Sequence, residues 1–363
     1  MLPRLEYLAW AIENYGSVRF DLGQSGMPSL AAKDVAPPEE LLAGAADPRA
    51  PRRWVEAIAQ RFDVDVAAVA PVLGTTHGLW AIYTALLSPG DEVLVEAPAY
   101  EPLIRLAEGV GARVVHFRRD LARGAPVEPD EVARALTDRT RLVVISNLHN
   151  PSSASVDDAT IAEVAKVAAR SQAHVLVDEV YRDMIDFRPE KAATAFRVAP
   201  NVITTSSLTK VYGLGWARAG WVLAEPKIAK RVFEATLHDA GGISWALSSI
   251  SEIAMKKIAH LHALSVAARA DDDVLGAMAD DFVRARPHLS MRRRAGAIFG
   301  FVSDSRGVDL RPAIERAVRD EQVIVAPGSF FGAPSGFRLR YGAMPKATLE
   351  EGLVRLGRAL DRP

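Results

Sequence analysis

The stretch "TRLVVISNLHNPSSASVDDATIAEVAKVAARSQAHVLVDE", residues 140–179, decides the fold. It begins and ends with apolar runs rich in β-branched residues, 140–146 and 174–179, which are typical of buried strands. Between them, residues 157–172 have helical periodicity and begin at an aspartate of the kind that caps helix N-termini. A strand, a helix and a second strand in this order predict a parallel sheet covered by helices on both faces.

The alternation continues on both sides of this stretch. Further strands are predicted at 91–98, 112–117, 201–207 and 219–224, with a helix at 77–87. After Pro226 long helical patterns take over, and strands return at 297–304, 322–327 and 336–343 around a helix at 311–321. We therefore predict an α/β protein: a three-layer α/β/α large domain with a mostly parallel sheet, and a smaller C-terminal α/β domain. The predicted boundaries are 1–30 for an N-terminal arm that packs on the small domain or on a partner subunit, 31–245 for the large domain and 246–363 for the small domain.

Length and composition narrow the class of protein. At 363 residues the chain exceeds the size at which one hydrophobic core usually stops growing, so two domains are expected. A formal net charge of -1 gives no general attraction to nucleic acid or to an anionic membrane. No stretch approaches the roughly 20 apolar residues of a membrane span, and no signal peptide is apparent. Cysteine is absent, which excludes disulfides and thiolate metal sites and fits a cytoplasmic protein.

Ligands of parallel sheets bind at the carboxyl ends of the strands, so polar residues that follow apolar runs are candidates for a site. In "PVLGTTHGLWAIYTALL" (71–87), Gly74, Thr75 and Thr76 lead directly into an amphipathic helix. Free backbone N–H groups, hydroxyls and the positive end of a helix dipole suit a phosphate. The sequence lacks the Gly-Lys-Ser/Thr ending of a Walker loop. A threonine acting only as a helix cap remains an alternative.

Two further candidates follow the strands of the opening stretch. Asn150 and Pro151 come after the first strand, where Asn-Pro is also a common turn. Asp178 ends the second strand and Tyr181 lies three residues later, so a carboxylate and a phenol can converge on one ligand. Asp178 can equally cap the next helix. His149, beside Asn150, is a candidate either for the site or for packing.

The segment "TTSSLTKVYGLGWARAGW" (204–221) places Lys210 after a strand rich in hydroxyls. A lysine in a partly desolvated pocket has a lowered pKa and can form a Schiff base with a carbonyl group. Ser207, Thr209 and Arg218 would hold a phosphate beside it. In "GFRLRYGA" (336–343), Arg338 shares a strand face with Arg340 and can grip a carboxylate, although a solvated strand face is an alternative.

These motifs, in this order, resemble the class I/II aminotransferases of the fold-type I pyridoxal phosphate enzymes, from about Leu22 to Tyr341. The family's Asn-Pro matches residues 150–151, its Asp-x-x-Tyr matches 178–181, and its Ser-x-Ser-Lys matches 207–210, with Thr209 in place of the second serine. The arginine eight residues beyond the lysine is Arg218. "EAPAYEPL" (96–103) is similar to the segment whose aromatic residue, here Tyr100, stacks on the cofactor ring. "VIVAPGSFFG" (323–332) followed by "FRLRYGA" is similar to the family's C-terminal signature.

The resemblance implies that pyridoxal 5′-phosphate is the cofactor and that an amino group moves between an L-amino acid and a 2-oxo acid by a ping-pong mechanism. It implies that Lys210 carries the cofactor aldehyde and later moves the Cα proton to the cofactor's C4′. Asp178 would keep the pyridine nitrogen protonated, and Asn150 and Tyr181 would bind the ring's phenolic oxygen. Lys210, Asp178 and Tyr181 are thus the implied catalytic residues. The other implied contacts are Thr75, Thr76, Tyr100, Ser207, Thr209 and Arg218 for the cofactor, and Arg338, Gly23 and Asn150 for the substrate.

The chain departs from the family pattern at three places. The family's Asn-Pro-Thr-Gly continues here with Ser152 and Ser153, and Trp216 stands where a glycine is usual. "LLAGAADPRAPRRWVEAIA" (41–59) lacks the family tyrosine that reaches the phosphate from the neighbouring subunit. Family members usually place the active site between two subunits, so the resemblance implies a homodimer. It leaves open whether a partner residue contacts the phosphate, and it leaves the side-chain specificity open.

Other functions remain as alternatives. The same scaffold hosts β-lyases and decarboxylases that use the same lysine and aspartate. Some ligand-sensing regulators carry such a domain behind a DNA-binding domain, but only about twenty residues precede the first landmark here, so we expect none. The basic run 284–294 is interpreted as a solvated face. His260 and His262 are two apart on a predicted helix and point in different directions, so no metal site is expected.

Overall fold

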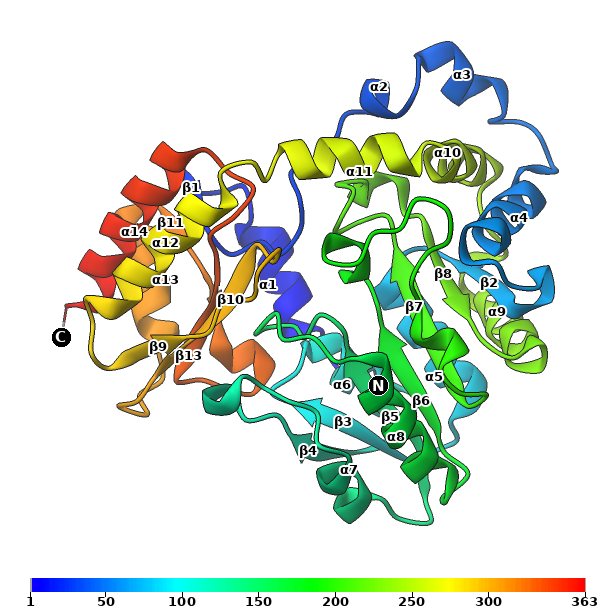
Figure 1. The fold of residues 1–363 in the computed structure, drawn as a ribbon, viewed down its shortest axis with the longest axis horizontal. Helices are drawn as coiled ribbons and strands as arrows, with labels where there is room; N and C mark the ends of the chain where they lie inside the picture. The colour runs from blue at the N-terminus through cyan, green and yellow to red at the C-terminus, as the bar shows by residue number, and fades with distance from the viewer. Residues whose placement is uncertain (1, 363) are drawn as a thin grey trace.

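The computed structural model describes residues 2–362 and shows a larger and a smaller part (Figure 1). The larger part contains a seven-stranded sheet with strand order β2-β8-β7-β6-β5-β3-β4. Neighbouring strands are parallel except at β8, which is antiparallel to both β7 and β2. The strands are β2 (Val69–Val72), β3 (Glu92–Ala97), β4 (Arg113–Arg118), β5 (Thr140–Ser146), β6 (His174–Asp178), β7 (Val202–Ser207) and β8 (Gly220–Leu223).

Successive side chains along each strand of this sheet point to opposite faces. Leu142 and Val144 of β5 pack in the core that lies under α5 and α6, whereas Val143 and Ile145 pack in the core under α8. Because both faces are buried there, the central strands β3, β5 and β6 consist mainly of apolar residues. The helices of the larger part are α2 (Ala32–Val35), α3 (Pro38–Ala43), α4 (Ala50–Phe62), α5 (Thr75–Leu86), α6 (Glu101–Gly109), α7 (Pro129–Ala135), α8 (Asp158–Ala169), α9 (Pro226–Ala240), α10 (Trp245–Lys256) and α11 (Ile258–Ala267).

The smaller part is an antiparallel sheet covered by helices. Its strand order is β12-β13-β10-β9, and Leu339 of β13 and Val302 of β10 pack against α12 and α14 in a separate core. A two-stranded parallel sheet joins β1 (Phe20–Asp21) to β11 (Val323–Ile324) and so ties the N-terminal segment to this part. The remaining elements are β9 (Leu289–Met291), β10 (Phe299–Asp304), β12 (Ala326–Pro327), β13 (Gly336–Arg340), α12 (Asp272–Arg284), α13 (Arg311–Glu321) and α14 (Lys346–Leu360).

The N-terminal helix α1 (Glu6–Asn14) lies between the two parts (Figure 1). Tyr7 packs in a small apolar cluster with Phe301, Phe330 and Phe331 of the smaller part, and its ring meets Tyr100 of the larger part edge-on at 5.6 Å. The N-terminal segment therefore contributes side chains to the junction between the two parts.

The predicted fold class is confirmed, and the strands and helices lie within a few residues of their predicted positions. The predicted strand 322–327 divides into β11 and β12, which belong to different sheets. Strands β1, β2 and β9 were not predicted. Strand β2 is only four residues long and contains Pro71, which is tolerated because β2 is an edge strand. The long helical pattern after residue 244 divides into α10, α11 and α12. Met255 and Leu261, from α10 and α11, share a core with Trp54 of α4 in the larger part, and the boundary at residue 246 stays a prediction. No helix within residues 2–362 is both long and apolar enough to cross a membrane.

Candidate active site

A cavity of about 420 Å³ lies at the carboxyl ends of β5, β6 and β7, between the larger part and α1. The sequence predicted most of the residues that line it, although they are spread over more than 140 positions. The predicted lining residues are Thr75, Thr76, Tyr100, Asn150, Asp178, Tyr181, Thr209, Lys210 and Arg218. Of the other predicted residues, Ser207 and Arg338 contact members of this set, and Gly23 contacts Arg338.

Asp178 ends β6 with its side chain buried at 4% exposure. Its Oδ1 accepts a hydrogen bond of 3.0 Å from the backbone N–H of Val180, which forms a tight turn; no α-helix begins there, so the helix-cap alternative is wrong. Burial raises the pKa of Asp178 from its ordinary value of 3.8 to about 7. A buried carboxyl group of this kind requires a positively charged partner to be fully ionised at neutral pH.

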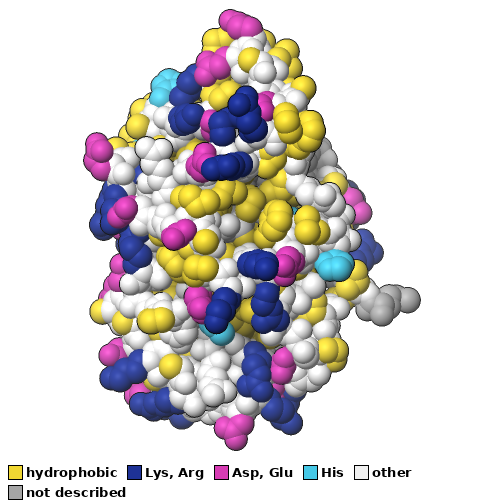
Figure 2. All heavy atoms as spheres, turned by 90° about the vertical axis from the view of Figure 1, so that its right-hand side faces the viewer, with side chains coloured by type: hydrophobic (Ala, Val, Ile, Leu, Met, Phe, Trp, Pro, Cys, Tyr) yellow, Lys and Arg dark blue, Asp and Glu magenta, His cyan; other side chains and the backbone are white. Residues whose placement is uncertain are grey.

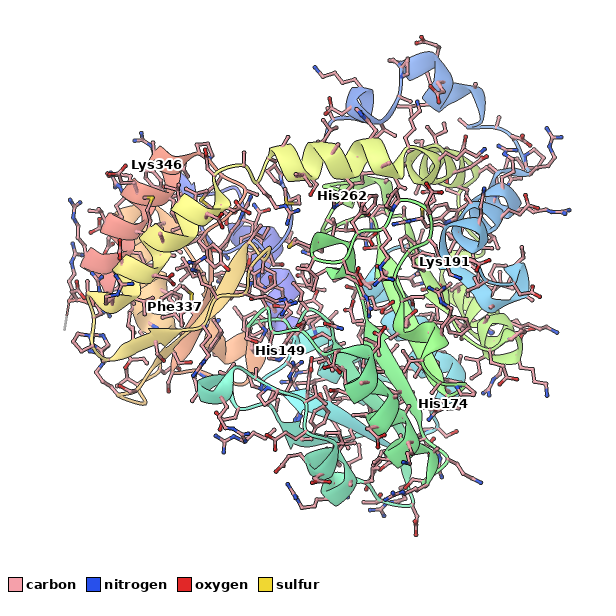
Figure 3. The ribbon with its side chains drawn as sticks, in the orientation of Figure 1. His149, His174, Lys191, His262, Phe337 and Lys346 are labelled. Carbon is pink, nitrogen blue, oxygen red and sulfur yellow. The ribbon has the colours of Figure 1, made fainter. Side chains whose placement is uncertain are left out.

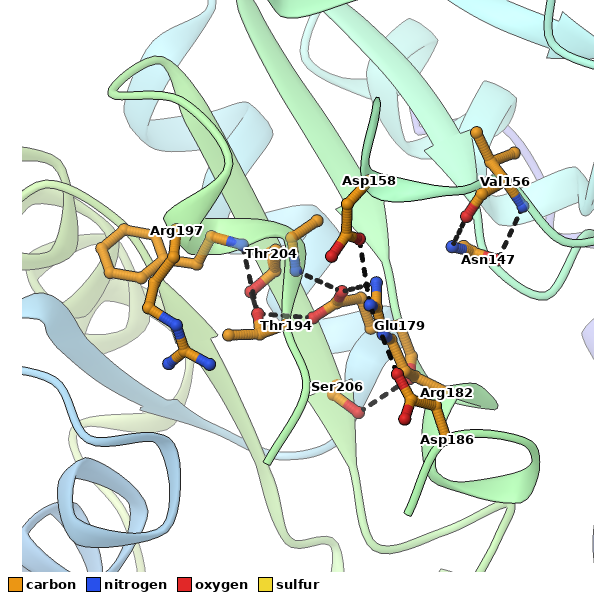
Figure 4. A network of polar contacts seen from close by, with 12 residues as sticks. Asn147, Val156, Asp158, Glu179, Arg182, Asp186, Thr194, Arg197, Thr204 and Ser206 are labelled. Atoms are coloured by element: carbon orange, nitrogen blue, oxygen red, sulfur yellow. Dashed lines mark hydrogen bonds and ion pairs between the residues drawn. The ribbon is translucent and has the colours of Figure 1, made fainter. Parts of the chain in front are cut away.

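A network around the next residue, Glu179, fixes the turn that carries Asp178 and Tyr181 (Figure 4). The Glu179 carboxylate accepts hydrogen bonds from the Thr194 hydroxyl at 2.7 Å and from the Ala195 N–H at 2.7 Å, and it pairs with Arg182 at 3.2 Å. Ser206 of β7 donates to the Glu179 carbonyl oxygen at 3.2 Å. The two strand ends are therefore held together beneath the cavity.

Lys210 follows β7 and points into the cavity. Its backbone carbonyl accepts a hydrogen bond of 2.8 Å from Met27, and a Cβ placed on Gly26 would lie 3.2 Å from the Lys210 Cδ, so the N-terminal segment closes over the lysine stem. Burial, opposed by nearby Tyr7 and Asp178, lowers the pKa of the Lys210 amine. A lowered pKa increases the neutral, nucleophilic fraction of the amine.

Hydroxyls, a helix N-terminus and a guanidinium surround one corner of the cavity. Helix α5 begins at Thr75 behind Gly74, which has φ +86 and makes no side-chain cap, so the threonine-cap alternative is wrong. A Cβ on Gly74 would lie 2.8 Å from Nη2 of Arg218, so a larger residue would adopt a strained φ and would displace the guanidinium. The Thr75 and Ser207 hydroxyls are 3.5 Å apart, and the buried Thr209 hydroxyl has no hydrogen-bond partner within residues 2–362. This corner can hold a phosphate.

Arg338 of β13 belongs to the smaller part, is fully buried, and contacts Asn150 and Tyr7, two residues that line the cavity. Its Nη1 donates to Oδ1 of Asn150 at 2.6 Å, and its Nη2 donates to the carbonyl oxygen of Gly23 at 2.8 Å. Among residues 2–362, no hydrogen-bond partner of Arg338 is a carboxylate. A buried cation without a counter-ion is costly, so this position suits an anionic ligand. Arg340 is also buried and donates to backbone carbonyls of Gly342 and Ala343, so the solvated-face alternative is wrong.

Sequence reasoning missed two phenols at this site. The Tyr7 hydroxyl lies 2.8 Å from Nη2 of Arg338 and 3.1 Å from the Tyr15 hydroxyl, and Tyr15 donates to the Gly23 carbonyl at 2.8 Å. Ser25, also unpredicted, accepts a hydrogen bond of 2.8 Å from Tyr181. Tyr7 and Tyr15 belong to the N-terminal arm, which was predicted only to pack on the small domain or on a partner subunit. Arg338, which both phenols contact, is more than 300 residues away and leaves no local signal.

The departures from the family pattern have identifiable structural effects. Ser153 has φ +61 and is fully buried, so a serine adopts the left-handed conformation that glycine adopts more easily. His149, near the junction of the two parts in Figure 3, contacts Ser152 Oγ at 2.6 Å and the Pro98 carbonyl at 2.8 Å, which is a structural role. The Trp216 indole donates to the Leu30 carbonyl at 2.9 Å and fastens the N-terminal segment to the loop after Lys210.

Residues 46–356 match the sequence model of the family described as aminotransferase class I and II. The chain belongs to this family. It is 27% identical over 371 residues to a capreomycidine synthase of Streptomyces vinaceus, with 99% of this chain and 94% of that protein covered. It is 30% identical over 319 residues to an arginine–pyruvate transaminase of Pseudomonas aeruginosa, with 84% and 79% covered.

Solved structures agree with the fold. A PLP-dependent aminotransferase from Streptococcus suis superimposes with a TM-score of 0.85 over 100% of this chain and 99% of that one, at 21% identity. The predicted fold-type I architecture is therefore confirmed. As a class I/II aminotransferase, the chain is an enzyme that uses pyridoxal phosphate to transfer amino groups.

Proposed function

We propose that this aminotransferase moves an amino group between an L-amino acid and a 2-oxo acid, with Lys210 as the reactive amine. The observation that carries the proposal is that an amine, a buried carboxyl group and a phosphate-sized polar corner line one cavity. These three groups come from the ends of three different strands: Lys210 follows β7, Asp178 ends β6, and the corner at Gly74 follows β2. A cofactor with an aldehyde, a ring nitrogen and a phosphate needs these three partners at once.

The residues fit that cofactor. The unpartnered Thr209 hydroxyl and the close approach of Gly74 to Arg218 are accounted for by a phosphate bound between the α5 N-terminus and the guanidinium. Thr75, Thr76 and Ser207 supply further hydroxyls at this corner. The buried Asp178 carboxyl is accounted for by a protonated pyridine nitrogen, which would supply the missing positive charge.

The remaining residues orient the substrate and the ring. Tyr100 provides an aromatic wall, and Asn150 and Tyr181 provide polar groups that adjust the ring's electronic properties without reacting. Arg338, with Asn150 and Gly23 beside it, would bind the substrate α-carboxylate, since its buried charge has no carboxylate partner in the described part of the chain. An arginine binds a carboxylate through two parallel N–H groups, which also fixes the direction of Cα.

Proton transfer is assigned to Lys210. Bound pyridoxal phosphate supplies a conjugated ring that accepts the electron pair left when the Cα–H bond of the amino acid breaks. The Lys210 amine removes the proton from the substrate Cα and later gives a proton to the cofactor's C4′. This general acid–base role is worth on the order of 10²–10⁴-fold in rate. Its lowered pKa increases the fraction of the amine that can accept a proton.

The test is a half-reaction. Cofactor-loaded protein is mixed with single L-amino acids in the absence of any 2-oxo acid, and the 2-oxo acid formed is quantified. We expect about one equivalent of 2-oxo acid per site and conversion of the cofactor to its aminated form, as a ping-pong mechanism requires. Consumption of amino acid without the aminated cofactor would refute transamination.

A second candidate is a synthase reaction. The relative that covers 99% of this chain is named a capreomycidine synthase rather than an aminotransferase. On the same scaffold, the lysine and the aspartate can also catalyse reactions in which a different bond of the substrate is made or broken. The half-reaction separates the two candidates, because transamination leaves the cofactor in its aminated form.

We also propose that the enzyme is a cytoplasmic homodimer. Figure 2 shows an apolar band on the face formed by α4, α9 and α10. On it, Phe233, Leu237 and Trp245 are 39%, 45% and 48% exposed, and Pro51 and Pro71 line the adjoining hollows. An apolar surface of this kind supports an interface with a second copy.

A further inference from the structure

The N-terminal helix α1 places a phenol against the arginine that we assign to the substrate carboxylate. Tyr7 is 5% exposed, lines the cavity with Lys210, and its hydroxyl oxygen lies 2.8 Å from Nη2 of Arg338. The centre of the guanidinium also lies 5.6 Å from the centroid of the Tyr7 ring. Tyr7 and Arg338 are 331 residues apart in the chain.

The hydrogen bonds around Tyr7 have a definite direction. Arg338 has only donors, so the Tyr7 oxygen accepts from it. Tyr15 uses its single proton to bond the Gly23 carbonyl at 2.8 Å, so the contact of 3.1 Å between the two phenols is a donation from Tyr7 to Tyr15. The Tyr7 hydroxyl therefore donates a long hydrogen bond to a neutral acceptor, Tyr15. A carboxylate would accept a stronger hydrogen bond from the same hydroxyl.

We propose that Tyr7 is a substrate-binding residue whose hydroxyl donates a hydrogen bond to the carboxylate held by Arg338. This inference rests on the proposed function, since it adds a residue to the same carboxylate site. On binding, the Tyr7 proton turns from Tyr15 to the carboxylate oxygen, and the Tyr7 oxygen continues to accept from Arg338. No covalent bond changes.

The position of Tyr7 is fixed before substrate binds. The Glu101 carboxylate accepts hydrogen bonds from the backbone N–H groups of Glu6 at 3.0 Å and Tyr7 at 2.6 Å, so the first turn of α1 is tied to the start of α6. The Tyr7 ring packs at 5.6 Å from both Tyr100 and Phe330. A preorganised donor loses little entropy when the ligand arrives.

Two electrostatic features agree with a ligand at this point. The Arg338 Nε–H is buried and has no hydrogen-bond partner within residues 2–362, so the guanidinium has a donor to spare. Burial opposes ionisation of Tyr7, but the positive charges of Arg338 and Lys210 outweigh it and place the pKa of the phenol below its ordinary value. A phenol of lowered pKa is a stronger hydrogen-bond donor to a carboxylate.

The experiment measures the affinity of the cofactor-loaded protein for propionate, an unreactive carboxylate, by calorimetry. We expect Tyr7→Phe to raise the Kd about tenfold, which equals about 1.4 kcal/mol. The ring is retained, so its packing on Phe330 is preserved and the variant should fold. Tyr341→Phe is the matched control: Tyr341 is 1% exposed, outside the cavity, and its hydroxyl has no partner within residues 2–362, so its Kd should not change.

A Kd for Tyr7→Phe within twofold of the wild-type value overturns the inference, and so does an equal rise in Tyr341→Phe. Wild-type protein that binds propionate but gives no half-reaction refutes the proposed function alone. An active aminotransferase whose Tyr7→Phe variant binds propionate normally refutes this inference alone.

Discussion

Arg338 donates a hydrogen bond of 2.6 Å to Asn150, although the two residues are 188 positions apart and belong to different parts of the molecule. The bond connects β13 of the smaller part to the loop after β5 of the larger part. Any ligand that binds this pair therefore contacts both parts at once. The junction between the parts is thus a component of the proposed substrate site.

The first prediction concerns Arg338. Arg338→Lys should lower kcat/KM for the amino acid by roughly 10²-fold, since truncating a buried charged hydrogen-bond group typically costs about 2–5 kcal/mol. The measurement is steady-state kinetics with a single amino donor. Arg340→Lys is the matched control on the same strand, because Arg340 bonds only backbone carbonyls away from the cavity. Equal losses in both variants would argue against a carboxylate on Arg338.

The second prediction concerns the phosphate corner. Gly74→Ala should weaken cofactor binding at least about tenfold, because the new Cβ would lie 2.8 Å from the Arg218 guanidinium and because φ +86 is strained for alanine. The Kd for pyridoxal phosphate is measured by adding it to cofactor-free protein. Gly90→Ala is the control: φ is +93 there, but a Cβ would meet nothing within 4 Å. Cofactor affinity that is unchanged in Gly74→Ala would place the phosphate elsewhere.

The third prediction is a pH dependence of stability in the cofactor-free protein. Burial raises the pKa of Asp178 from 3.8 to about 7 in the folded protein. As the pH rises, Asp178 therefore loses its proton at a lower pH in the unfolded state than in the folded state. The free energy of unfolding therefore falls as the pH rises from 4 to 7, by up to roughly 4 kcal/mol, and stays lower at higher pH. Asp178→Asn should raise the melting temperature of the cofactor-free protein at pH 8, and the gain should vanish near pH 4.

A carboxylate with the opposite shift provides the control for that prediction. Asp304 is buried, but its hydrogen bonds to Arg306 lower its pKa despite the burial. Asp304→Asn should therefore lower the melting temperature at pH 8. If Asp178→Asn also destabilises the cofactor-free protein at pH 8, Asp178 is ionised and paired in the empty site, contrary to our account.

The fourth prediction concerns the proposed homodimer. Leu237→Glu places a charge in the apolar band on α9, so it should convert the dimer to a monomer in light scattering at micromolar concentration. Val308→Glu, at a similarly exposed apolar residue (45%) outside this band, should leave the mass unchanged. A wild-type protein that is monomeric at all concentrations would contradict the proposal.

Local patterns predicted the fold, and the order of the motifs, through their resemblance to a known family, predicted about half of the residues that line the cavity. The parallel sheet was predicted from apolar runs such as 140–146. A strand that is buried on both faces has apolar residues at successive positions instead of an alternation of polar and apolar residues. The cavity residues followed from spaced motifs because each motif lies at a strand end, and strand ends meet at one edge of the sheet.

The rest depended on contacts between distant segments. Nothing near Tyr7 in the sequence indicates that its hydroxyl meets Arg338, because the two residues are 331 positions apart and lie on separate elements, α1 and β13. Pro71 concealed β2, since proline normally argues against a strand and only the edge position permits it. Trp216 appeared as a departure from the family pattern, and its hydrogen bond to Leu30 became visible only in three dimensions.

The most direct test of the account is the site of covalent attachment. Cofactor-loaded protein is reduced with borohydride, digested and mapped by mass spectrometry, with Lys210→Ala treated in parallel. We predict that the reduced cofactor is attached to Nζ of Lys210 and that the variant carries none. Attachment at another lysine, or equal labelling of Lys210→Ala, would contradict the assignment of Lys210 as the reactive amine.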